Sequence, residues 1–400
     1  MFRQAFGRAR SMLQRAGLGL VCVALVASCG GGVDSGGTGA PAASYASGPI
    51  TGFGSVIVNG VHFDDRSAGV SDADGNARTR DDLRLGMTTN VLGSAITVDA
   101  GGNQTSTAMS IVFASEIVGP LSASDLVART LTVLGQTVDI SSTTAFDAVM
   151  IGGQAALVPG DIVEVYGHLD VATLHYAATR VERKAGALAF RLRGIVSGLD
   201  AAGKVFSIGA TRISYAGAAV VPATLSNGRF VRVLLAVTPS GGTWNAIAVG
   251  DGIQPIGDRD QATIKGLVSA FTSNAQFSVN GTPVDASTAQ FPAGTAGLGL
   301  GTRVEVEGTS AAGVLVATVV KLISDGDQAG ESFEVQGPIT AVMPLDQTFV
   351  VHDVTVSYSG VVDFRNGSAA DLAVGRSVQA RGTLSSDGTR LQASRITFGN

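Results

Sequence analysis

One short phrase occurs five times along the chain, and this repetition restricts the fold more than any other feature of the sequence. The phrase reads GPITG from Gly48, and its copies GPLSA, GIVSG, GLVSA and GPITA begin at Gly119, Gly194, Gly266 and Gly337. Successive copies are 71, 75, 72 and 71 residues apart. Two further phrases recur in the same register. One is a glycine followed by alternating apolar residues, and the other is an Ala-x-x-Ile or Ala-x-x-Val ending. The sequence therefore predicts five copies of one module of about 70 residues.

Each module carries the pattern of β-strands. Two segments of alternating apolar residues follow the first phrase, as in SVIVNGVHFD, and a two-residue turn such as Asn59–Gly60 separates them. Such residues tolerate the positive φ that a tight hairpin turn requires. The glycine-led phrase alternates too, and places Val304 and Val306 on one face of a strand with Glu305 and Glu307 on the other. Every module is thus predicted to contain three strands, a link and two more strands.

The link before the fourth strand has a helix-start signal in two modules. Thr79 precedes Asp82 by three residues, and Ser368 precedes Asp371 by three, which is the spacing of a capping box. Each signal predicts one short helical turn. Five strands in about 70 residues are too few for a seven-stranded sandwich, which needs roughly 100 residues, but they suit the Greek-key barrel called the OB-fold. The predicted fold class is all-β, with five tandem small five-stranded OB-like barrels after a cleaved lipoprotein signal and a flexible tether.

The start of the chain has the order of a secretory leader. Four arginines precede a 12-residue apolar run from Ala16 to Ala27, whereas a membrane-spanning helix needs roughly 20 residues. The ending Val26-Ala27-Ser28-Cys29 resembles the lipobox of bacterial lipoproteins, which implies cleavage before Cys29 and acylation of its side chain. Gly30 in the next position resembles the outer-membrane sorting signal of Gram-negative bacteria. We therefore predict a lipid-anchored protein of the cell envelope.

The phrases and the composition also set the expected boundaries. Gly30 to Pro49 is rich in Gly, Ala and Ser and is typical of a flexible tether. The predicted segments are a signal peptide at 1–28, a tether at 29–46, and modules 1 to 5 at 47–114, 115–186, 187–252, 262–325 and 332–400.

The repeated phrases also support a family resemblance. GPITGFGSVIVNGVHFD and the recurring L-x-x-G-x-x-V-x-V-x-G, as in LGLGTRVEVEG, resemble bacterial lipoproteins built of tandem small OB-like β-barrel repeats, a domain-of-unknown-function family. The resemblance covers roughly Gly48 to the C-terminus. It implies an architecture and a location, and it brings no activity and no catalytic residues.

Charge and aromatic content argue against nucleic acid as a partner. Without the four arginines of the leader, 23 basic residues face 32 acidic residues, which gives a net charge of −9. Binding of single-stranded nucleic acid needs a cationic groove and aromatic stacking platforms. Trp244 is the one tryptophan, and Phe206, Phe277 and Phe349 occupy strand positions that face the predicted core.

Catalytic signals are weak. The four histidines, His62, His168, His175 and His352, do not recur at one aligned position, and we expect them at the surface or in turns. No G-x-S-x-G stands on a strand-to-helix turn, and no zinc-ligand spacing occurs. The sequence predicts neither an enzyme nor a cofactor.

One acidic segment suggests a metal site. Asp64 to Asp82 is an insertion peculiar to module 1, and within it Asp72, Asp74 and Asn76 offer alternate oxygen ligands of the kind that Ca²⁺ prefers. The spacing departs from an EF-hand, which has glycine at position six and Glu at position twelve. Here Gly75 is fourth and Leu83 is twelfth. A solvated acidic turn beside nearby arginines is the alternative.

These features favour a lipid-anchored binding or scaffold protein without catalytic activity, whose several similar faces add up weak contacts. A ligand- or Ca²⁺-binding protein in which one module carries the site is the first alternative, and an enzyme of unknown type is the second. The expected partners are the membrane, through the lipid, and an envelope protein or glycan. The sequence leaves the oligomeric state open.

Overall fold

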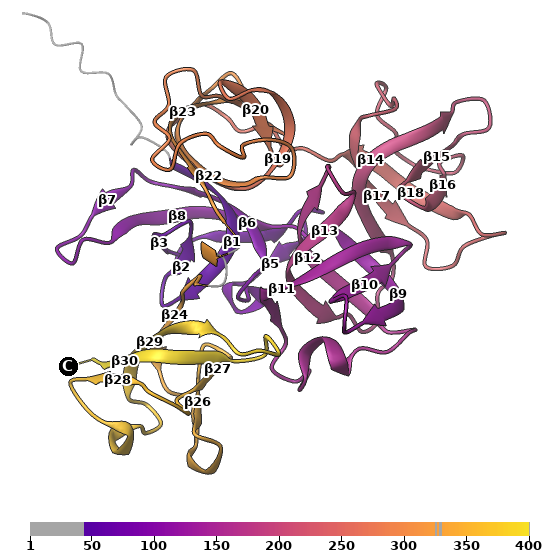
Figure 1. The fold of residues 1–400 in the computed structure, drawn as a ribbon. Helices are drawn as coiled ribbons and strands as arrows, with labels where there is room; N and C mark the ends of the chain where they lie inside the picture. The colour runs from indigo at the N-terminus through magenta and orange to yellow at the C-terminus, as the bar shows by residue number, and fades with distance from the viewer. Residues whose placement is uncertain (1–43, 325, 328–329, 400) are drawn as a thin grey trace, which may run out of the picture. The chain divides into compact units, whose positions relative to one another are not determined.

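The structure is a computed structural model that describes residues 44–324, 326–327 and 330–399 (Figure 1). The predicted signal peptide, Cys29 and the predicted tether up to residue 43 lie outside the described residues. Strands joined by turns and short 3₁₀ helices build the modules. Within the residues that the structure describes, no helix is long and apolar enough to cross a membrane.

All five modules close five strands into a barrel in the same order. In module 1 the first strand pairs with the second and the second with the third, all antiparallel. The third strand then runs parallel to the fifth, the fifth is antiparallel to the fourth, and the fourth returns to the first. Modules 2 to 5 repeat these pairings (Figure 1). This closed order is that of an OB-like Greek-key barrel, and the predicted all-β fold class is confirmed.

The bounds of the elements follow the repeat. Module 1 contains β1 (Ser44–Phe53), β2 (Val56–Val58), β3 (Val61–Asp64), β4 (Gly69–Asp72), β5 (Ala77–Arg78), η1 (Arg80–Asp82), β6 (Thr88–Gly93), β7 (Thr97–Val98) and β8 (Gln104–Phe113). Module 2 contains β9 (Ile117–Asp125), β10 (Thr130–Val133), β11 (Gln136–Phe146), η2 (Gly153–Ala156), β12 (Ile162–Asp170) and β13 (His175–Arg183). Module 3 contains β14 (Phe190–Asp200), β15 (Val205–Ile208), β16 (Thr211–Ser214), β17 (Phe230–Leu235) and β18 (Trp244–Asp251).

The last two modules have the same plan. Module 4 contains β19 (Arg259–Ser273), β20 (Gln276–Val279), β21 (Thr282–Asp285), β22 (Arg303–Ala311) and β23 (Val314–Leu322). Module 5 contains β24 (Phe333–Pro338), β25 (Ala341–Met343), η3 (Pro344–Asp346), β26 (Thr348–Val351), β27 (Val354–Ser357), β28 (Asp363–Arg365), η4 (Ala369–Asp371), β29 (Ser377–Leu384) and β30 (Leu391–Phe398). In module 5 the first barrel strand is split into β24 and β25.

The glycine that opens the first phrase lies under the second-to-third-strand hairpin. A Cβ on Gly119 would lie 2.4 Å from the Leu134 side chain, and one on Gly266 would lie 2.0 Å from Asn280. Leu134 and Asn280 are the first turn residues of their hairpins, and both have the positive φ that the sequence predicted there. The close approach of the hairpin to the first strand therefore explains why this glycine recurs in every module.

A β-bulge explains the Ala-x-x-Ile/Val ending. In a regular strand, residues three apart point to opposite faces. In each module, however, the pairing of the last two strands skips one residue of the last strand; in module 4, Glu307 pairs with Val319 while Gly308 pairs with Ala317. The skipped residue returns both Ala317 and Val320 to the buried face. The same register shift occurs in the other four modules.

Both predicted helical turns are present. Thr79 and Asp82 form a capping box at η1, and Ser368 and Asp371 form one at η4. Each turn is followed by a buried or nearly buried leucine, Leu83 or Leu372. The turn thus closes the barrel end before the fourth strand begins.

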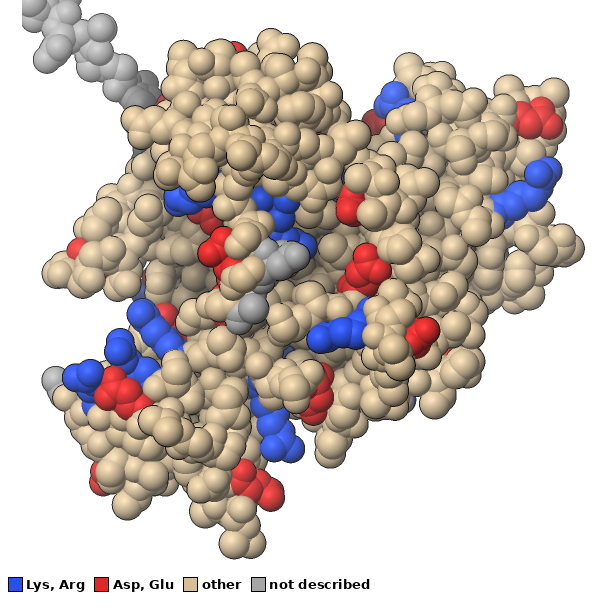
Figure 2. All heavy atoms as spheres, in the orientation of Figure 1, with Lys and Arg blue, Asp and Glu red and all other residues tan. Residues whose placement is uncertain are grey.

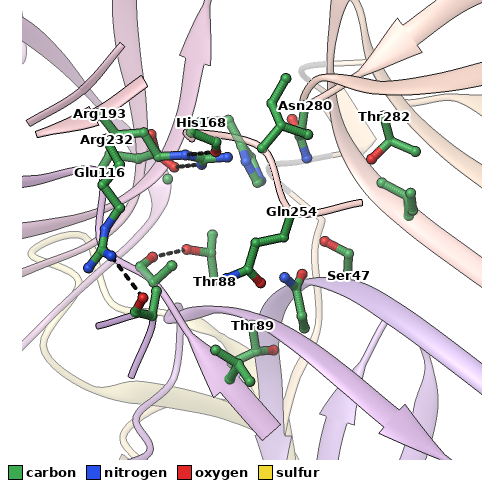
Figure 3. Close-up of a pocket in the computed structure, with 18 of the residues that line it drawn as sticks. Ser47, Thr88, Thr89, Glu116, His168, Arg193, Arg232, Gln254, Asn280 and Thr282 are labelled. Atoms are coloured by element: carbon green, nitrogen blue, oxygen red, sulfur yellow. Dashed lines mark hydrogen bonds and ion pairs between the residues drawn. The ribbon is translucent and has the colours of Figure 1, made fainter. Parts of the chain in front are cut away.

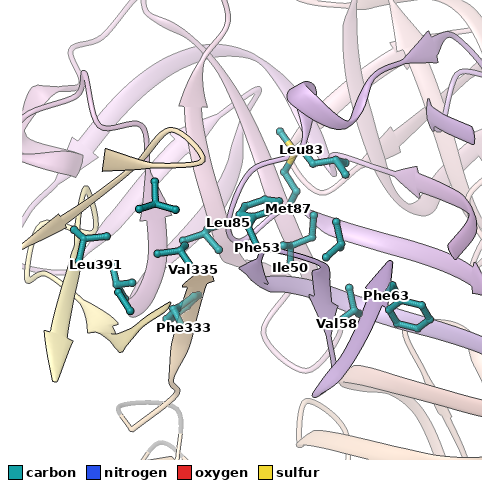
Figure 4. Close-up of a cluster of buried hydrophobic side chains, with 14 of the residues drawn as sticks. Ile50, Phe53, Val58, Phe63, Leu83, Leu85, Met87, Phe333, Val335 and Leu391 are labelled. Atoms are coloured by element: carbon teal, nitrogen blue, oxygen red, sulfur yellow. The ribbon is translucent and has the colours of Figure 1, made fainter. Parts of the chain in front are cut away.

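The apolar side chains gather in three clusters, and two of these clusters extend across module boundaries. One cluster belongs to modules 2 and 3, and another to module 4. The largest joins modules 1 and 5, where Phe53 and Met87 lie in the same cluster as Phe333 and Val335 (Figure 4). Phe206, Phe277 and Phe349 are buried as predicted.

Backbone hydrogen bonding also joins different modules. The first half of β1, from Ser44 to Ser47, runs parallel to β19 of module 4, and Gly52 and Phe53 pair with β24 of module 5. Strand β9 of module 2 pairs with β14 of module 3. Strand β1 thus begins at Ser44, inside the segment expected to be tether, because its first residues have partners in β6 and in module 4 that the local sequence does not reveal.

Candidate functional site

A polar cavity of about 150 Å³ lies where modules 1 to 4 meet (Figure 3). Each of the four modules contributes wall residues, and so does the link between modules 3 and 4. The polar wall residues that matter below are Tyr45 and Ser47 of β1, Glu116 and His168 of module 2, Arg193 and Arg232 of module 3, Gln254 of the link, and Asn280 and Thr282 of module 4.

A second lobe of about 230 Å³ adjoins this cavity. The two lobes share the wall residues Glu116, His168, Arg193, Ile253 and Asn280. The second lobe adds apolar side chains, namely Leu169, Val171, Ile195, Phe230 and Ala270. The combined space therefore has a polar part and a more apolar part.

A buried ion pair forms one wall of the cavity. Glu116 precedes β9 and is 2% exposed, and its Oε1 accepts a hydrogen bond from Nη1 of Arg193. Nε of Arg193 donates to the carbonyl of Gly252 at 2.6 Å, and the guanidinium lies 4.7 Å from the ring centroid of Phe230. Burial raises the pKa of Glu116, and Arg193 opposes that shift. The second carboxylate oxygen, Oε2, has no hydrogen-bond partner among the described residues.

His168 forms the neighbouring wall, and here the expectation of a surface histidine is wrong. Its side chain is 7% exposed, and Nε2 has no hydrogen-bond partner among the described residues (Figure 3). Burial, together with a smaller effect of the nearby charges of Arg303, Arg193 and Lys265, lowers the pKa of His168 to about 3. The imidazole is therefore neutral at ordinary pH. The charges come from modules 3 and 4, which is why the sequence of module 2 does not reveal them.

Two further charged residues line the cavity, and both have ion-pair partners: Arg232 with Asp74 and Asp251 with Arg229. The rest of the polar wall is uncharged. Burial raises the pKa of Tyr45 to about 12, although a hydrogen bond with Ser47 acts against this shift. Ser47 and Thr282 add hydroxyl groups, and Gln254 adds an amide (Figure 3). These groups can donate and accept hydrogen bonds without attracting an ion.

The predicted metal ligands lie elsewhere, and Asp72 has partners within its own loop. Its Oδ1 accepts hydrogen bonds from the backbone N–H groups of Asp74 and Asn76, each at 3.0 Å. Its Oδ2 accepts from Nη2 of Arg78 at 2.7 Å. Burial by itself raises the pKa of Asp72, but the hydrogen bonds from Asn76 and Arg78 bring it below its usual value.

Asp74 joins module 1 to module 3. Its carboxylate forms ion pairs with Arg191 of β14 and Arg232 of β17, and the carbonyl of Ala73 accepts a hydrogen bond from Arg232 at 2.8 Å. Among the described residues, no three His, Cys, Asp or Glu side chains are grouped so as to hold a metal ion. Asp72 and Asp74 thus have protein donors as partners, and Ca²⁺ binding stays a prediction.

A larger, charged cleft of about 800 Å³ lies beside the acidic insertion. Its walls include Asp72, Asp74, Arg191, Glu164 and Lys184. Here acids and bases are paired with one another, as in the contact of 2.6 Å between Lys184 and Glu164. Nε of Arg191 and Oε2 of Glu164 make no hydrogen bond among the described residues, but both groups belong to ion pairs. The central cavity differs because Nε2 of His168 on its wall has neither a hydrogen bond nor an ion pair among the described residues.

The other three histidines are more exposed than His168. His175 lies 3.1 Å from Asp139, and His62 contacts Ser55 at 3.3 Å; both side chains are partly exposed. His352 is exposed in the second-to-third-strand turn of module 5, as the sequence predicted. Cys29 lies outside the described residues, so its acylation stays a prediction.

Comparison with known proteins supports the repeat and leaves the function open. Residues 118–182, 265–321 and 336–397 match the model of a domain of unknown function (DUF5666). The three matches fall within modules 2, 4 and 5. No curated protein sequence matches this chain.

One solved structure that resembles the chain is described as "drosophila Unr CSD456". It has 12% sequence identity and a TM-score of 0.13, and the match covers 52% of this chain and 97% of that one. A similarity at this level says nothing about function.

Proposed function

We propose that this chain is a lipid-anchored protein of the bacterial cell envelope, at the outer membrane, that binds a partner without catalysing a reaction. The lipobox-like segment that ends at Cys29 supports the anchor. The partner that the surface favours is an envelope protein or a glycan.

The observation that carries the proposal is the pairing of modules that are distant in the sequence. Strand β1 is hydrogen-bonded to β19 of module 4 and to β24 of module 5. Binding surfaces on these modules are therefore held together before a partner arrives, which reduces the entropy that binding loses. Independent modules on flexible links would lack this advantage.

The chemistry of the cavity favours binding over catalysis. A general acid or base works best with a pKa near the working pH, whereas burial lowers the pKa of His168 to about 3. Glu116 is held by Arg193. The face drawn in Figure 2 is covered mostly by uncharged residues, so a partner there would be held mainly by uncharged polar and apolar contacts.

The test is capture of partners from native membranes with the full-length lipidated protein. Deleting whole modules is unsuitable because modules 1 and 5 share one apolar cluster. Single changes of exposed apolar side chains, one for each module, are better. Suitable variants are Val98→Ser, Val127→Ser, Val220→Ser, Leu300→Ser and Leu345→Ser, whose side chains are all more than half exposed.

Scaffolding through several modules predicts that recovery of the partner falls partially in two or more of these variants. Loss in one variant alone favours the alternative, in which a single module carries the site. Recovery of no envelope partner by the wild-type protein would contradict the proposal. Cys29→Ser tests the anchor separately, because it should release an unacylated protein from the membrane fraction.

A further inference from the structure

We propose that the central cavity, where modules 1 to 4 meet, binds one small, uncharged, hydroxyl-rich molecule of the size of a monosaccharide. This inference rests on the proposed function, because it names a ligand class for a binding protein. Three observations support it: buried polar atoms without a partner, the volume of the cavity, and the pairing of the charges on its wall.

Three buried polar atoms on the wall lack a hydrogen-bond partner among the described residues. They are Oε2 of Glu116, in a residue that is 2% exposed, Nε2 of His168, in a residue that is 7% exposed, and Nε of Arg232. Buried polar groups in folded proteins almost always have a hydrogen-bond partner, because leaving one unpaired is unfavourable. Water or a ligand must supply that partner.

The size of the space suits a single small ring. The polar lobe of about 150 Å³ has room for several water molecules or one small ring. The adjoining lobe of about 230 Å³ extends the space past Ile253 toward Phe230. A folded partner or a long chain would not fit, whereas a sugar ring would fill the polar lobe.

The charges on the wall leave nothing for an ionic ligand. Glu116 is paired with Arg193, Arg232 is paired with Asp74, and Asp251 is paired with Arg229. An added anion or cation would meet a charge that already has a partner. The positive groups near His168 also disfavour a cation.

Hydroxyl groups match all three unpartnered atoms. The carboxylate oxygen of Glu116 can only accept a hydrogen bond, Nε of Arg232 can only donate, and the neutral ring of His168 donates from one nitrogen and accepts at the other. A hydroxyl can donate to Glu116, accept from Arg232, and either accept from or donate to His168. The hydroxyls of Ser47 and Thr282 and the amide of Gln254 surround the same space (Figure 3).

The adjoining lobe fits the apolar face of such a ligand. A sugar ring has apolar C–H faces as well as hydroxyl edges, and Ile195, Ile253 and Phe230 line the more apolar lobe. A ligand pocket with mostly apolar walls and a few placed polar groups is the usual arrangement for a small molecule.

The experiment measures binding of defined sugars to the purified full-length protein by titration calorimetry. Glucose and N-acetylglucosamine are the uncharged probes, and glucuronate and glucosamine are the anionic and cationic controls of similar size. We expect saturable binding of an uncharged probe, and at least tenfold weaker binding of both charged ones. A methyl glycoside and a disaccharide of the best probe then distinguish a free sugar from the end of a glycan, because only a site open to a glycan end tolerates the added group.

Two variants test the wall, and one control matches them. Glu116→Gln and Thr282→Val should each weaken binding about tenfold, which is the usual effect of losing one hydrogen bond to a charged or buried group. Glu334 occupies the same position before the first-phrase glycine in module 5 and forms an ion pair with Arg381 outside the cavity. Glu334→Gln should therefore bind the sugar like the wild-type protein.

The inference is overturned if none of the uncharged probes binds, or if Glu116→Gln and Thr282→Val bind as tightly as the wild-type protein. If Glu116→Gln does not fold, Thr282→Val decides alone, because valine keeps the shape of threonine. Failure of sugar binding together with successful capture of an envelope partner rejects the ligand and leaves the proposed function standing. Sugar binding without any captured partner supports the ligand and rejects the proposed envelope partner.

Discussion

Module 1 has two kinds of contact with the other modules. Toward module 5 it is apolar, with Phe53 and Met87 in one cluster with Val335 (Figure 4). Toward modules 2, 3 and 4 it borders the polar cavity through Tyr45 and Ser47 (Figure 3). Both contacts involve the same strand, β1, whose two halves pair with different modules.

The same repeat position has different roles in modules 2 and 5. Glu116 and Glu334 both lie three residues before the first-phrase glycine of their modules. Glu334 forms an ion pair with Arg381 of its own module at 2.7 Å, whereas Glu116 is paired with Arg193 of the next module and keeps one oxygen toward the cavity. The neighbouring modules, not the barrel itself, decide whether that position contributes to stability or to a site.

The largest expected effect is at the apolar contact. Phe53→Ala removes a ring that is 8% exposed from the cluster shared by modules 1 and 5. We expect the free energy of unfolding to fall by about 4 kcal/mol, as for other buried aromatic truncations. Urea denaturation, followed by circular dichroism, measures the change.

The matched control is Leu345→Ala in module 5, where the side chain is fully exposed. Its effect should stay within about 0.5 kcal/mol. Equal losses in both variants would show that modules 1 and 5 do not share a core.

The second effect is at the polar contact. Arg193→Met leaves the carboxylate of Glu116 buried without its ion-pair partner. Breaking a buried pair from one side destabilises strongly, and we expect a loss of about 3 kcal/mol in the free energy of unfolding. Adding Glu116→Gln to Arg193→Met should recover more than half of that loss, because the unpaired charge is gone. A double variant no more stable than the single one would argue against the pair, and thermal unfolding of the four proteins gives the comparison.

The sequence predicted the barrel because its signals are local. The turn residues Asn59–Gly60, the capping pair Thr79 and Asp82, and the alternation around Val304 all involve neighbours within a few residues. The alternation within a strand also predicts which of its residues are buried, since alternate residues face one way. The fold class followed from these signals and from five copies of each.

The site did not follow from them, because contacts between modules have no local pattern. His168 was expected at the surface or in a turn, but it is buried, and the residues that cover it come from modules 3 and 4. Glu116 and Arg193 look like ordinary strand-flanking charges in the sequence. A weak signal was present nonetheless, since Glu116 and Arg193 lie within three residues of a first-phrase glycine, but Lys265 and Glu334 do so in modules 4 and 5 as well.

The third effect is a pH dependence that arises from His168. Its folded-state pKa of about 3 is below the ordinary value of 6.5, so between these values the unfolded chain binds a proton that the folded chain does not. The stability that this group contributes is complete above pH 6.5 and is lost as the pH falls toward 3. From pH 7 to pH 5 the loss is about 2 kcal/mol.

Comparison of the wild-type protein with His168→Gln isolates the contribution of His168 to the pH dependence of stability. The difference in unfolding free energy between pH 7 and pH 5 should be smaller in the variant by about 2 kcal/mol. Glu116 faces the same cavity with a raised pKa and acts in the opposite direction, but it is present in both proteins. Identical pH profiles would mean that His168 is solvated, which would leave the polar contact without its main distinguishing group.

The smallest effect concerns the acidic insertion, which joins the polar contact from outside the cavity. Asp74→Ala removes the ion pairs with Arg191 and Arg232 across modules 1 and 3, and we expect a loss of about 1 kcal/mol in unfolding free energy. Added Ca²⁺ tests the competing use of the same carboxylates, because an ion held by Asp72, Asp74 and Asn76 would raise the melting temperature of the wild-type protein. That rise should vanish in Asp72→Ala plus Asp74→Ala. Since both aspartates already have donor partners in the structure, we expect the loss of stability and no rise with Ca²⁺, and a rise that depends on both carboxylates would reassign the insertion from a contact between modules to a metal site.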